Sequence, residues 1–243
     1  MAVLERSRRQ TNIETAGDAP ATTVRLTIAR SDAGAVREFR VALTQPAVVL
    51  DALLAGQRLD PSLGFRYSCR VAMCGTCAVR VNGRPTLACQ QPITPDTDEL
   101  LLEPLAGFAV VRDLVVDTSP FWNAWRRVVP WFMPGGPREA LPAGDASRAE
   151  VERGLDCIAC GACWSACDVV VTNAGYLGPA ALNRALTLVA DERDGARAER
   201  LRVAGQQGGV THCHSILGCT AACPKGLDPS ASIRRLRRWS LVA

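Results

Sequence analysis

The chain has 243 residues, of which 48% are hydrophobic and 21% are charged, and this is the composition of a globular protein with room for two domains. Its formal net charge of +4 is mild, and no basic run with interleaved aromatic residues occurs in the body of the chain, which argues against a nucleic-acid-binding protein. No stretch approaches the roughly 18 uninterrupted apolar residues of a membrane-spanning helix.

The first 21 residues are polar and mixed in charge. Ser7-Arg8-Arg9 is like the start of a twin-arginine signal, but no apolar stretch follows it, so we do not expect export. Glu5, Glu14 and Asp18 interrupt the segment, which argues against an organellar transit peptide. We therefore expect a disordered tail over residues 1–21.

The segment that follows has the pattern of a small α+β sheet domain. Val24, Leu26 and Ile28 alternate with polar residues, as expected for a half-buried strand. Asn82-Gly83 favours the positive φ angles of a tight hairpin turn. The predicted elements are strands at 22–28, 38–43, 78–81, 84–88 and 99–103 and a helix at 46–58.

Beyond residue 107 the pattern becomes helical. The helices of this part are too short to enclose a large core without help, so we expect bound groups to contribute to it. Helices are predicted at 110–116, 121–129, 147–155, 179–190, 196–203 and 230–239, with a Pro/Gly-rich link at 130–144. We expect the domain boundary within 107–144, with a first domain at 22–125, a linker at 126–144 and a second domain at 145–243.

Eleven cysteines, arranged in three tight groups, are the unusual feature of the composition. A disulfide framework is typical of short secreted chains, whereas this chain has an odd count and no secretion signal. The cysteines therefore indicate ligation of a metal or a cluster in a reducing compartment.

The first group has the spacing C-x4-C-x2-C followed by one more cysteine, which is the plant-type pattern for a 2Fe–2S cluster. Its members are Cys69, Cys74, Cys77 and Cys89. Small residues in the loop, such as Gly75 and Thr76, let backbone N–H groups approach the sulfurs. Zinc is the alternative, but zinc sites usually combine two short C-x2-C turns, which this group lacks.

The second group, Cys157, Cys160, Cys163 and Cys167, has the bacterial ferredoxin spacing, in which the fourth cysteine ligates the other cluster of a pair. The third group is Cys213, Cys219 and Cys223, followed by Pro224. On the same template Ile216 takes the position of a second cysteine. Three thiolates suffice for a 3Fe–4S cluster, and the apolar Ile216 offers no ligand to a fourth iron.

The cross-over rule then divides these seven cysteines between two clusters. It predicts a 4Fe–4S cluster on Cys157, Cys160, Cys163 and Cys223, and a 3Fe–4S cluster on Cys167, Cys213 and Cys219. Together with the 2Fe–2S cluster, this assignment uses all eleven cysteines. Buried thiols without a ligand role would not be expected to fit three ligand sets with no cysteine left over.

Three clusters in one chain indicate a path for electrons rather than a reaction site. The chain has only two histidines and no glycine-rich dinucleotide fingerprint, so we expect no catalytic residues for substrate chemistry on it. Because clusters move single electrons, a partner with an organic cofactor such as flavin is expected to carry that chemistry.

The order of these motifs resembles the iron–sulfur subunit of succinate dehydrogenases and fumarate reductases, which are quinone-linked oxidoreductases. The similar stretches are CHSILGCTAACPKGLDP at 213–229, VVRDLVVD at 110–117 and GPAAL from Gly178, and the resemblance spans roughly residues 22–240. It implies a β-grasp, plant-type ferredoxin-like domain followed by an all-α helical ferredoxin domain. It also implies electron transfer between the FAD of a flavoprotein subunit and quinone at a membrane anchor. The subunit would be held peripherally by that anchor at the cytoplasmic face of the inner membrane.

Single residues carry the resemblance further. His214 matches a family histidine near quinone and the 3Fe–4S cluster, and Ile216 matches the family's apolar residue there. Trp164 lies within the cluster loop and either lines that region or packs against the cluster. Residues 168–172 read DVVVT where the family has Pro and a pair of Trp, so the quinone pocket departs from the usual kind. The basic end at 234–239 is either a solvated face or a docking surface for the anchor or for anionic lipid.

Three other functions compete with this interpretation. A thiol-coupled fumarate reductase commonly has additional cysteine-rich sequence after the last motif, which this chain lacks. A free-standing electron carrier would need neither the domain link nor the basic end, and it would purify without a flavoprotein. A zinc-stabilised nucleic-acid-binding protein does not fit the cysteine spacing.

Overall fold

The computed structural model describes residues 21–29, 36–137 and 148–241, and the chain divides into two compact units between Asp117 and Thr118. The predicted tail therefore lies outside the described residues, except for residue 21, which belongs to a strand. The predicted link at 130–144 lies outside them from residue 138 onward.

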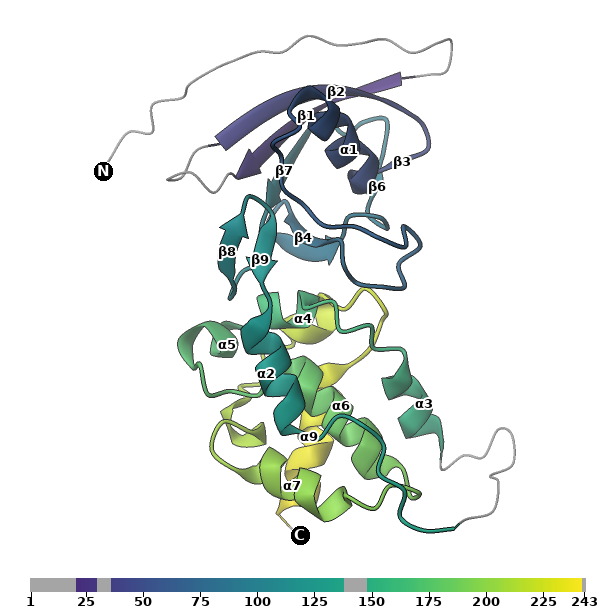
Figure 1. Cartoon of the computed structure of the whole chain (residues 1–243), viewed down its shortest axis with the longest axis vertical. Coiled ribbons are helices and arrows are strands. Elements are labelled where there is room, and N and C mark those ends of the chain that lie inside the picture. The colour runs from purple at the N-terminus through teal and green to yellow at the C-terminus, as the bar shows by residue number, and fades with distance from the viewer. Residues whose placement is uncertain (1–20, 30–35, 138–147, 242–243) are drawn as a thin grey trace. The chain divides into compact units, whose positions relative to one another are not determined.

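The first unit is built on a mixed five-stranded sheet with the order β2-β1-β7-β4-β5 (Figure 1). Strand β1 pairs antiparallel with β2 and parallel with β7, so the first strand of the chain lies inside the sheet. The five strands predicted for this unit are confirmed. Their bounds are β1 (Ala21–Ala29), β2 (Val36–Thr44), β4 (Ala78–Val81), β5 (Arg84–Leu87) and β7 (Glu99–Glu103).

Helix α1 (Val49–Leu59) covers one face of this sheet (Figure 1). Leu26 of β1 and Leu53 of α1 are almost completely buried, as the alternation in β1 and the apolar face of α1 predict. The helix starts three residues later than expected, because Ala47–Val48 form the short strand β3, which pairs with β6 (Pro92–Ile93). The Asp51 carboxylate accepts a hydrogen bond from the Val48 N–H at 3.0 Å and so caps the helix.

The helix predicted at 110–116 is wrong, because this segment forms an antiparallel hairpin of β8 (Ala109–Arg112) and β9 (Val115–Asp117). Its apolar residues fit a helical as well as a strand period, and the β-branched valines favour the strand. Asp113 takes the left-handed conformation in the turn, with φ of 48°. Its buried carboxylate accepts the Gly64 N–H at 2.7 Å and so ties the hairpin to the loop after α1.

The second unit is helical in its described part, apart from an isolated bridge between Pro134 and Asp194. Helix α6 is buried along most of its length and packs against five other helices. The predicted helices of this unit are confirmed, whereas three short helices among the cysteines, α4, α5 and α8, were not predicted. The helices are α2 (Ser119–Arg127), α3 (Ala149–Leu155), α4 (Ala162–Ser165), α5 (Asp168–Thr172), α6 (Gly178–Ala190), α7 (Arg197–Gly205), α8 (Gly218–Ala221) and α9 (Pro229–Ser240), with a 3₁₀ turn at Val210–His212.

Helix α2 belongs to this second unit, although the predicted first domain extended to residue 125. The helix packs on α6, and its Phe121 is buried with its ring 5.7 Å from that of Trp164. Its apolar face therefore contributes to the core of the helical unit.

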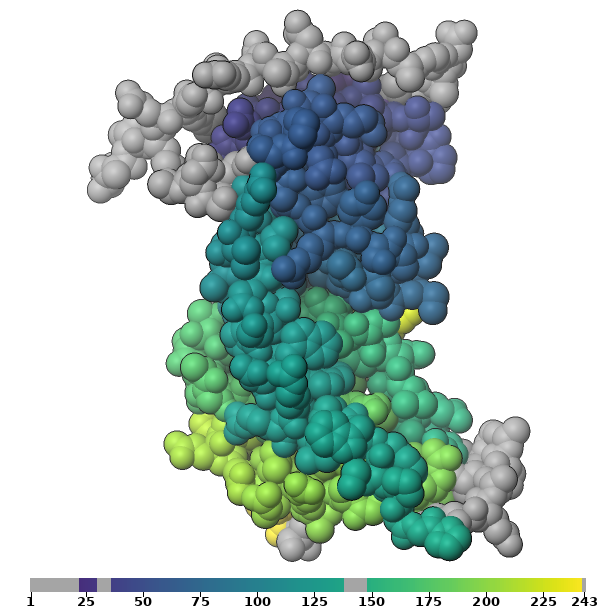
Figure 2. All heavy atoms as spheres, in the orientation of Figure 1, coloured from purple at the N-terminus to yellow at the C-terminus, as the bar shows by residue number. Residues whose placement is uncertain are grey.

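The segment after α2, residues 128–137, is held by buried arginine side chains. Arg200 is completely buried, forms an ion pair with Asp194, and donates to the carbonyls of Val129 at 3.1 Å and Trp131 at 2.7 Å. Arg184 Nε donates to the Pro130 carbonyl at 2.8 Å. Figure 2 shows α2 and this segment as a continuous teal band over the front of the helical unit. None of the helices in the described part of the chain combines the length and hydropathy needed to cross a bilayer.

Candidate metal centres

The first cysteine group lies in the loop between α1 and β4 of the first unit. Cys69 Sγ accepts backbone N–H groups from Met73 at 3.4 Å and Cys74 at 3.3 Å. These donors are turned toward the sulfur because the loop contains left-handed backbone conformations. They occur at Arg70, Ala72 and Gly75, with φ of 60°, 56° and 71°. The loop therefore surrounds a sulfur with N–H dipoles, as the small residues in the motif predicted.

The thiols of this loop differ in their surroundings. Cys74 is exposed, and a hydrogen bond from the Thr76 side chain lowers the pKa of its thiol to about 6. Burial, together with the nearby Cys89, raises the pKa of the Cys77 thiol to about 12. The Ala88 N–H donates to the Cys77 carbonyl at 3.0 Å, which brings the chain after β5 to the loop. The structure thus places Cys89 beside Cys77, although it lies beyond the hairpin.

In the second unit, one cavity is lined by four of the cysteines, Cys157, Cys160, Cys163 and Cys223. Its volume is about 390 Å³, counting the part open to solvent, and its other lining includes Pro224 and Asn183. Burial raises the pKa of the Cys160 thiol to about 11 and that of Cys163 well above its ordinary value. Each of the four sulfurs is close enough to a neighbouring thiol to affect its ionisation.

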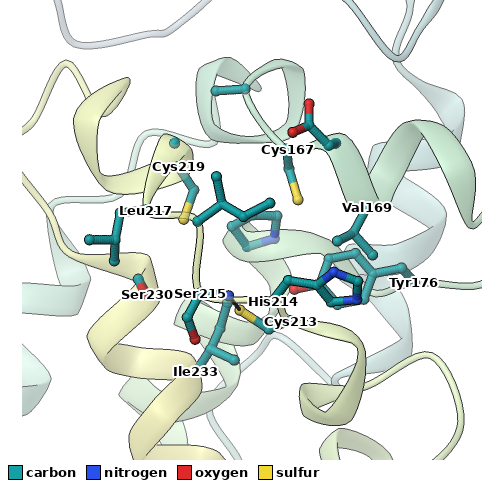
Figure 3. A pocket seen from close by; sticks show the side chains of 15 residues that line it. Cys167, Val169, Tyr176, Cys213, His214, Ser215, Leu217, Cys219, Ser230 and Ile233 are labelled. Atoms are coloured by element: carbon teal, nitrogen blue, oxygen red, sulfur yellow. Dashed lines mark hydrogen bonds between the residues drawn. The ribbon is translucent and has the colours of Figure 1, made fainter.

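A second cavity of the same volume is lined by the other three cysteines of this unit, Cys167, Cys213 and Cys219. Figure 3 shows their sulfurs directed toward one central space. Ile216 lines the same cavity, and no fourth cysteine is among its lining residues.

The donors of these sites fit iron–sulfur clusters. All eleven cysteines are free, and burial makes most of those in the helical unit hard to ionise. Several neighbouring thiolates require bound cations to compensate for their burial and mutual repulsion, and cluster irons supply such cations. Among the described residues, no group of three or more His, Cys, Asp or Glu side chains is arranged to hold a single metal ion.

The other residues singled out from the sequence separate into two sets. His214 and Ile216 line the three-cysteine cavity, and Val169 of α5, within the unusual 168–172 stretch, lines it too. Trp164 is buried and is not among the lining residues of either cavity. It packs against Phe121, and its ring fills the space beside Gly178, so the structure places it between α2 and α6.

Two residues that support the three-cysteine cavity were not predicted. Tyr176 is buried, its side chain is hydrogen-bonded to Cys213, and its pKa is raised by burial and by the nearby thiols. Arg237 of α9 donates from Nη2 to the carbonyls of Val210 at 2.7 Å and Cys213 at 2.8 Å. The only signal in the sequence for Tyr176 was its position two residues before Gly178, where the family-like GPAAL stretch begins.

The basic end at 234–239 is largely engaged within its own unit. Arg235 forms an ion pair with Glu150, and its guanidinium lies 5.2 Å from the centre of the Trp239 ring. Arg234 donates to Ser230 Oγ at 2.9 Å. Together with the contacts of Arg237, these interactions give the arginines a structural role that neither alternative from the sequence included.

Two family models match the chain. Residues 22–123 match the family described as a 2Fe-2S iron-sulfur cluster binding domain, and residues 154–227 match the family described as a 4Fe-4S dicluster domain. These matches confirm the predicted α+β class, the 2Fe–2S and 4Fe–4S clusters and the role in electron transfer.

Similar proteins point to one family. The mitochondrial succinate dehydrogenase (ubiquinone) iron-sulfur subunit 1 of Oryza sativa subsp. japonica is 37% identical over 215 residues, which cover 86% of this chain and 76% of the relative. The mitochondrial succinate dehydrogenase (ubiquinone) iron-sulfur subunit of Dictyostelium discoideum is 38% identical over 204 residues, or 78% of this chain and 71% of the relative.

A solved structure agrees with these relatives. A chain of the Mycobacterium smegmatis Sdh1 complex in the apo form superposes with a TM-score of 0.81 at 26% identity, and the match covers 92% of this chain and 97% of that chain. The chain described here therefore belongs to the family of succinate dehydrogenase iron–sulfur subunits, as its cysteine motifs predicted.

Proposed function

We propose that this subunit carries electrons between the FAD of a flavoprotein partner and quinone at a membrane anchor, through three clusters. When bound, iron–sulfur clusters accept and release single electrons. We assign Cys69, Cys74, Cys77 and Cys89 to a 2Fe–2S cluster, Cys157, Cys160, Cys163 and Cys223 to a 4Fe–4S cluster, and Cys167, Cys213 and Cys219 to a 3Fe–4S cluster.

The observation that carries this proposal is the division of seven cysteines between two separate cavities. Four line one cavity and three line the other, as expected from the cross-over spacing of a two-cluster ferredoxin. Ile216 lines the three-cysteine cavity and has no ligand atom to offer a fourth iron. This arrangement supports a 4Fe–4S and a 3Fe–4S cluster rather than two clusters of one kind.

The protein residues around these sites have three tasks in this function. Backbone N–H groups of the first loop donate to Cys69 Sγ, and such donors stabilise added negative charge. The buried cavities of the helical unit limit access of water to the thiolates. Arg237 fixes the loop that carries Cys213 and thereby the shape of the three-cysteine cavity.

We also propose a fold family for each domain and a location for the subunit at the membrane. The mixed sheet with α1 supports a β-grasp ferredoxin domain that ends at Asp117, and the short helices around two cavities, from α2 onward, support a helical ferredoxin domain. The subunit is peripheral, held by anchor subunits at the cytoplasmic face of the inner membrane. His214 and Val169 line the three-cysteine cavity and are the residues proposed to face quinone.

Low-temperature EPR of the anaerobically purified complex tests the three clusters. The oxidised sample is expected to give a 3Fe–4S signal, which dithionite replaces by signals of reduced 2Fe–2S and 4Fe–4S clusters. Two 4Fe–4S clusters and no oxidised signal would contradict the assignment. A tagged chain is expected to co-purify with a flavin-containing protein from detergent extracts, whereas isolation alone from the soluble fraction would favour a free carrier.

Substitution Ile216→Cys tests the role of this position directly. The added thiol is expected to weaken the oxidised 3Fe–4S signal and to produce a second reduced 4Fe–4S signal. Val171→Cys is the matched control, because Val171 is also exposed and apolar but does not line the cavity. An unchanged EPR spectrum of Ile216→Cys, with the new thiol present by mass spectrometry, would show that another feature limits the iron count.

A further inference from the structure

Helix α6 places a buried polar side chain against the four-cysteine cavity. Asn183 is 4% exposed and lines this cavity together with Cys157, Cys160, Cys163 and Cys223. The remaining lining is mostly apolar, with Ile158, Ala180, Leu227 and Pro229 among it. An amide in such surroundings is costly unless its polar atoms are hydrogen-bonded.

Only the oxygen end of this amide has a partner in the described structure. Ser232 Oγ, from α9, donates to Asn183 Oδ1 at 2.8 Å. Asn183 Nδ2 is buried and has no hydrogen-bond partner. Two N–H donors are therefore left without an acceptor at the wall of the cavity, and an unmade hydrogen bond of a buried group costs about 1–3 kcal/mol.

The contacts of Ser232 allow both orientations of the amide, but only one of them suits the cavity. The reversed amide would put its carbonyl oxygen, in place of Nδ2, at the wall of the cavity that the four cysteines also line. The sulfurs of these cysteines carry negative charge once they ligate iron, so an oxygen there would be repelled, whereas an N–H group would be attracted. The orientation with Nδ2 at the cavity is therefore the one compatible with a bound cluster.

We propose that Asn183 donates a side-chain N–H hydrogen bond to a sulfur of the 4Fe–4S cluster and raises the reduction potential of that cluster. The proposal rests on the cluster assignment made above. It explains the unpartnered nitrogen, because the missing acceptor is the cluster or one of its thiolates. Reduction adds negative charge to the cluster, so a donor that points at sulfur stabilises the reduced form more than the oxidised form.

The test is an EPR-monitored redox titration of the purified holo complex with the substitution Asn183→Leu. Leucine has a similar size and removes both donors. We expect the reduced-to-oxidised ratio of the 4Fe–4S cluster at a given potential to fall by up to about tenfold, which is a downward shift of about 59 mV for one electron. The midpoints of the 2Fe–2S and 3Fe–4S clusters are expected to stay in place.

Thr187→Val is the matched control. Thr187 lies one turn further along α6, is equally buried and donates to the Asn183 carbonyl at 2.9 Å, but it does not line the cavity. Its loss is expected to leave the 4Fe–4S midpoint unchanged. Ser232→Ala, which releases the oxygen end of the amide, is expected to shift the midpoint in the same direction as Asn183→Leu but by less.

A spectroscopic measurement separates a hydrogen bond from a general effect of packing. Pulsed EPR of the reduced cluster, with asparagine labelled by ¹⁵N in its side chain, is expected to show a coupling that disappears in Asn183→Leu and persists in Thr187→Val. An unchanged 4Fe–4S midpoint in Asn183→Leu, or equal shifts of all three clusters, would overturn the proposal about Asn183. Absence of a 4Fe–4S signal from the wild-type complex would instead overturn the cluster assignment.

Discussion

The cysteine loop of the first unit and the two cavities of the second unit stabilise their thiols in different ways. In the loop, Cys74 is exposed, and a donor two residues away lowers the pKa of its thiol to about 6. In the helical unit, Cys163 is buried, and burial together with neighbouring thiols raises its pKa. Backbone N–H groups donate to sulfur in both regions, as Ser215 N–H does to Cys213 Sγ at 3.4 Å, but in the helical unit burial outweighs such donors for most of the thiols.

The scaffolds differ in the same sense. The first unit has a five-stranded sheet and a covering helix, whose core of Leu26, Leu53 and their neighbours contains no cysteine of the loop except Cys77. The second unit is made of short helices, and its buried residues include Cys163 and Cys219. The 2Fe–2S site therefore lies on a domain whose core forms mainly without it, while the two sites of the helical unit contribute cysteines to the core of that unit.

The largest difference between the two units is expected when the clusters are removed. After oxidative loss of iron and chelation, the helical unit is expected to lose most of its amide protection, because the desolvated thiols lose their cations. The sheet of the first unit is expected to remain protected. Hydrogen exchange measured by mass spectrometry checks both units at once, and equal loss of protection in β1 and α6 would contradict the comparison.

Arg200→Met tests how far the helical unit depends on buried charge. The change removes the cation paired with the buried Asp194 carboxylate, which keeps only the N–H donors of Met133 and Ala196, and it leaves two carbonyls without the Arg200 donor. The helical unit is therefore expected to lose about 3–5 kcal/mol of its unfolding free energy. Urea unfolding of the holo protein measures this loss. Arg202→Met, on the exposed side of the same helix, is the control, and an equal loss there would refute the role of burial.

Glycine substitutions sharpen the comparison at a smaller scale. At Gly178, with φ of 78°, an added Cβ would lie 2.7 Å from a ring atom of Trp164, so Gly178→Ala is expected to cost about 3 kcal/mol from backbone strain and overpacking together. At Gly83 in the first unit, with φ of 79°, the nearest atom is 3.9 Å away, so Gly83→Ala is expected to cost only about 1–2 kcal/mol. If urea unfolding gave similar losses of unfolding free energy for the two substitutions, the Trp164 ring would be able to move away from the added methyl group at little cost.

A smaller effect than that of Gly178→Ala is expected for the pH dependence contributed by Asp191, at the end of α6. The Arg193 side chain donates to both of its carboxylate oxygens, at 2.9 and 2.8 Å, and together with Arg148 it lowers the pKa of Asp191. Asp191→Asn is expected to cost about 2 kcal/mol at pH 7. Because the folded pKa is lowered, this difference is present above the ordinary pKa of 3.8 and is lost as the pH falls through the lower folded value. Urea midpoints of both proteins over this range check the sign, and a difference that grows in acid would contradict it.

Local patterns predicted most of the fold. Alternation in β1 and the Asn82-Gly83 turn depend on neighbouring residues only, so the sheet followed from the sequence. The prediction of a helix at 110–116 failed because the apolar residues of this segment fit the helical period as well as the strand period. The short helices α4, α5 and α8 give no periodic signal within four or five residues.

The candidate sites were predictable to the same extent. The grouping of the cysteines follows from their spacing, since the cluster geometry dictates which thiols lie on one turn of chain. The contributions of Tyr176, Asn183 and Arg237 could not be predicted, because each depends on how helices distant in sequence pack together. The position of Trp164 also required the packed structure, since a tryptophan beside a cysteine can face either way.

The hydrogen bonds from Arg237 to the loop that carries Cys213 have a consequence for biosynthesis. The ribosome makes the loop before it makes helix α9, so the carbonyls of Val210 and Cys213 have no donor until α9 has emerged and docked. All four thiols of the first unit are already available at that time. The order of translation therefore completes the ligand set of the first unit before the wall of the three-cysteine cavity, so the first unit can acquire its iron and sulfide earlier.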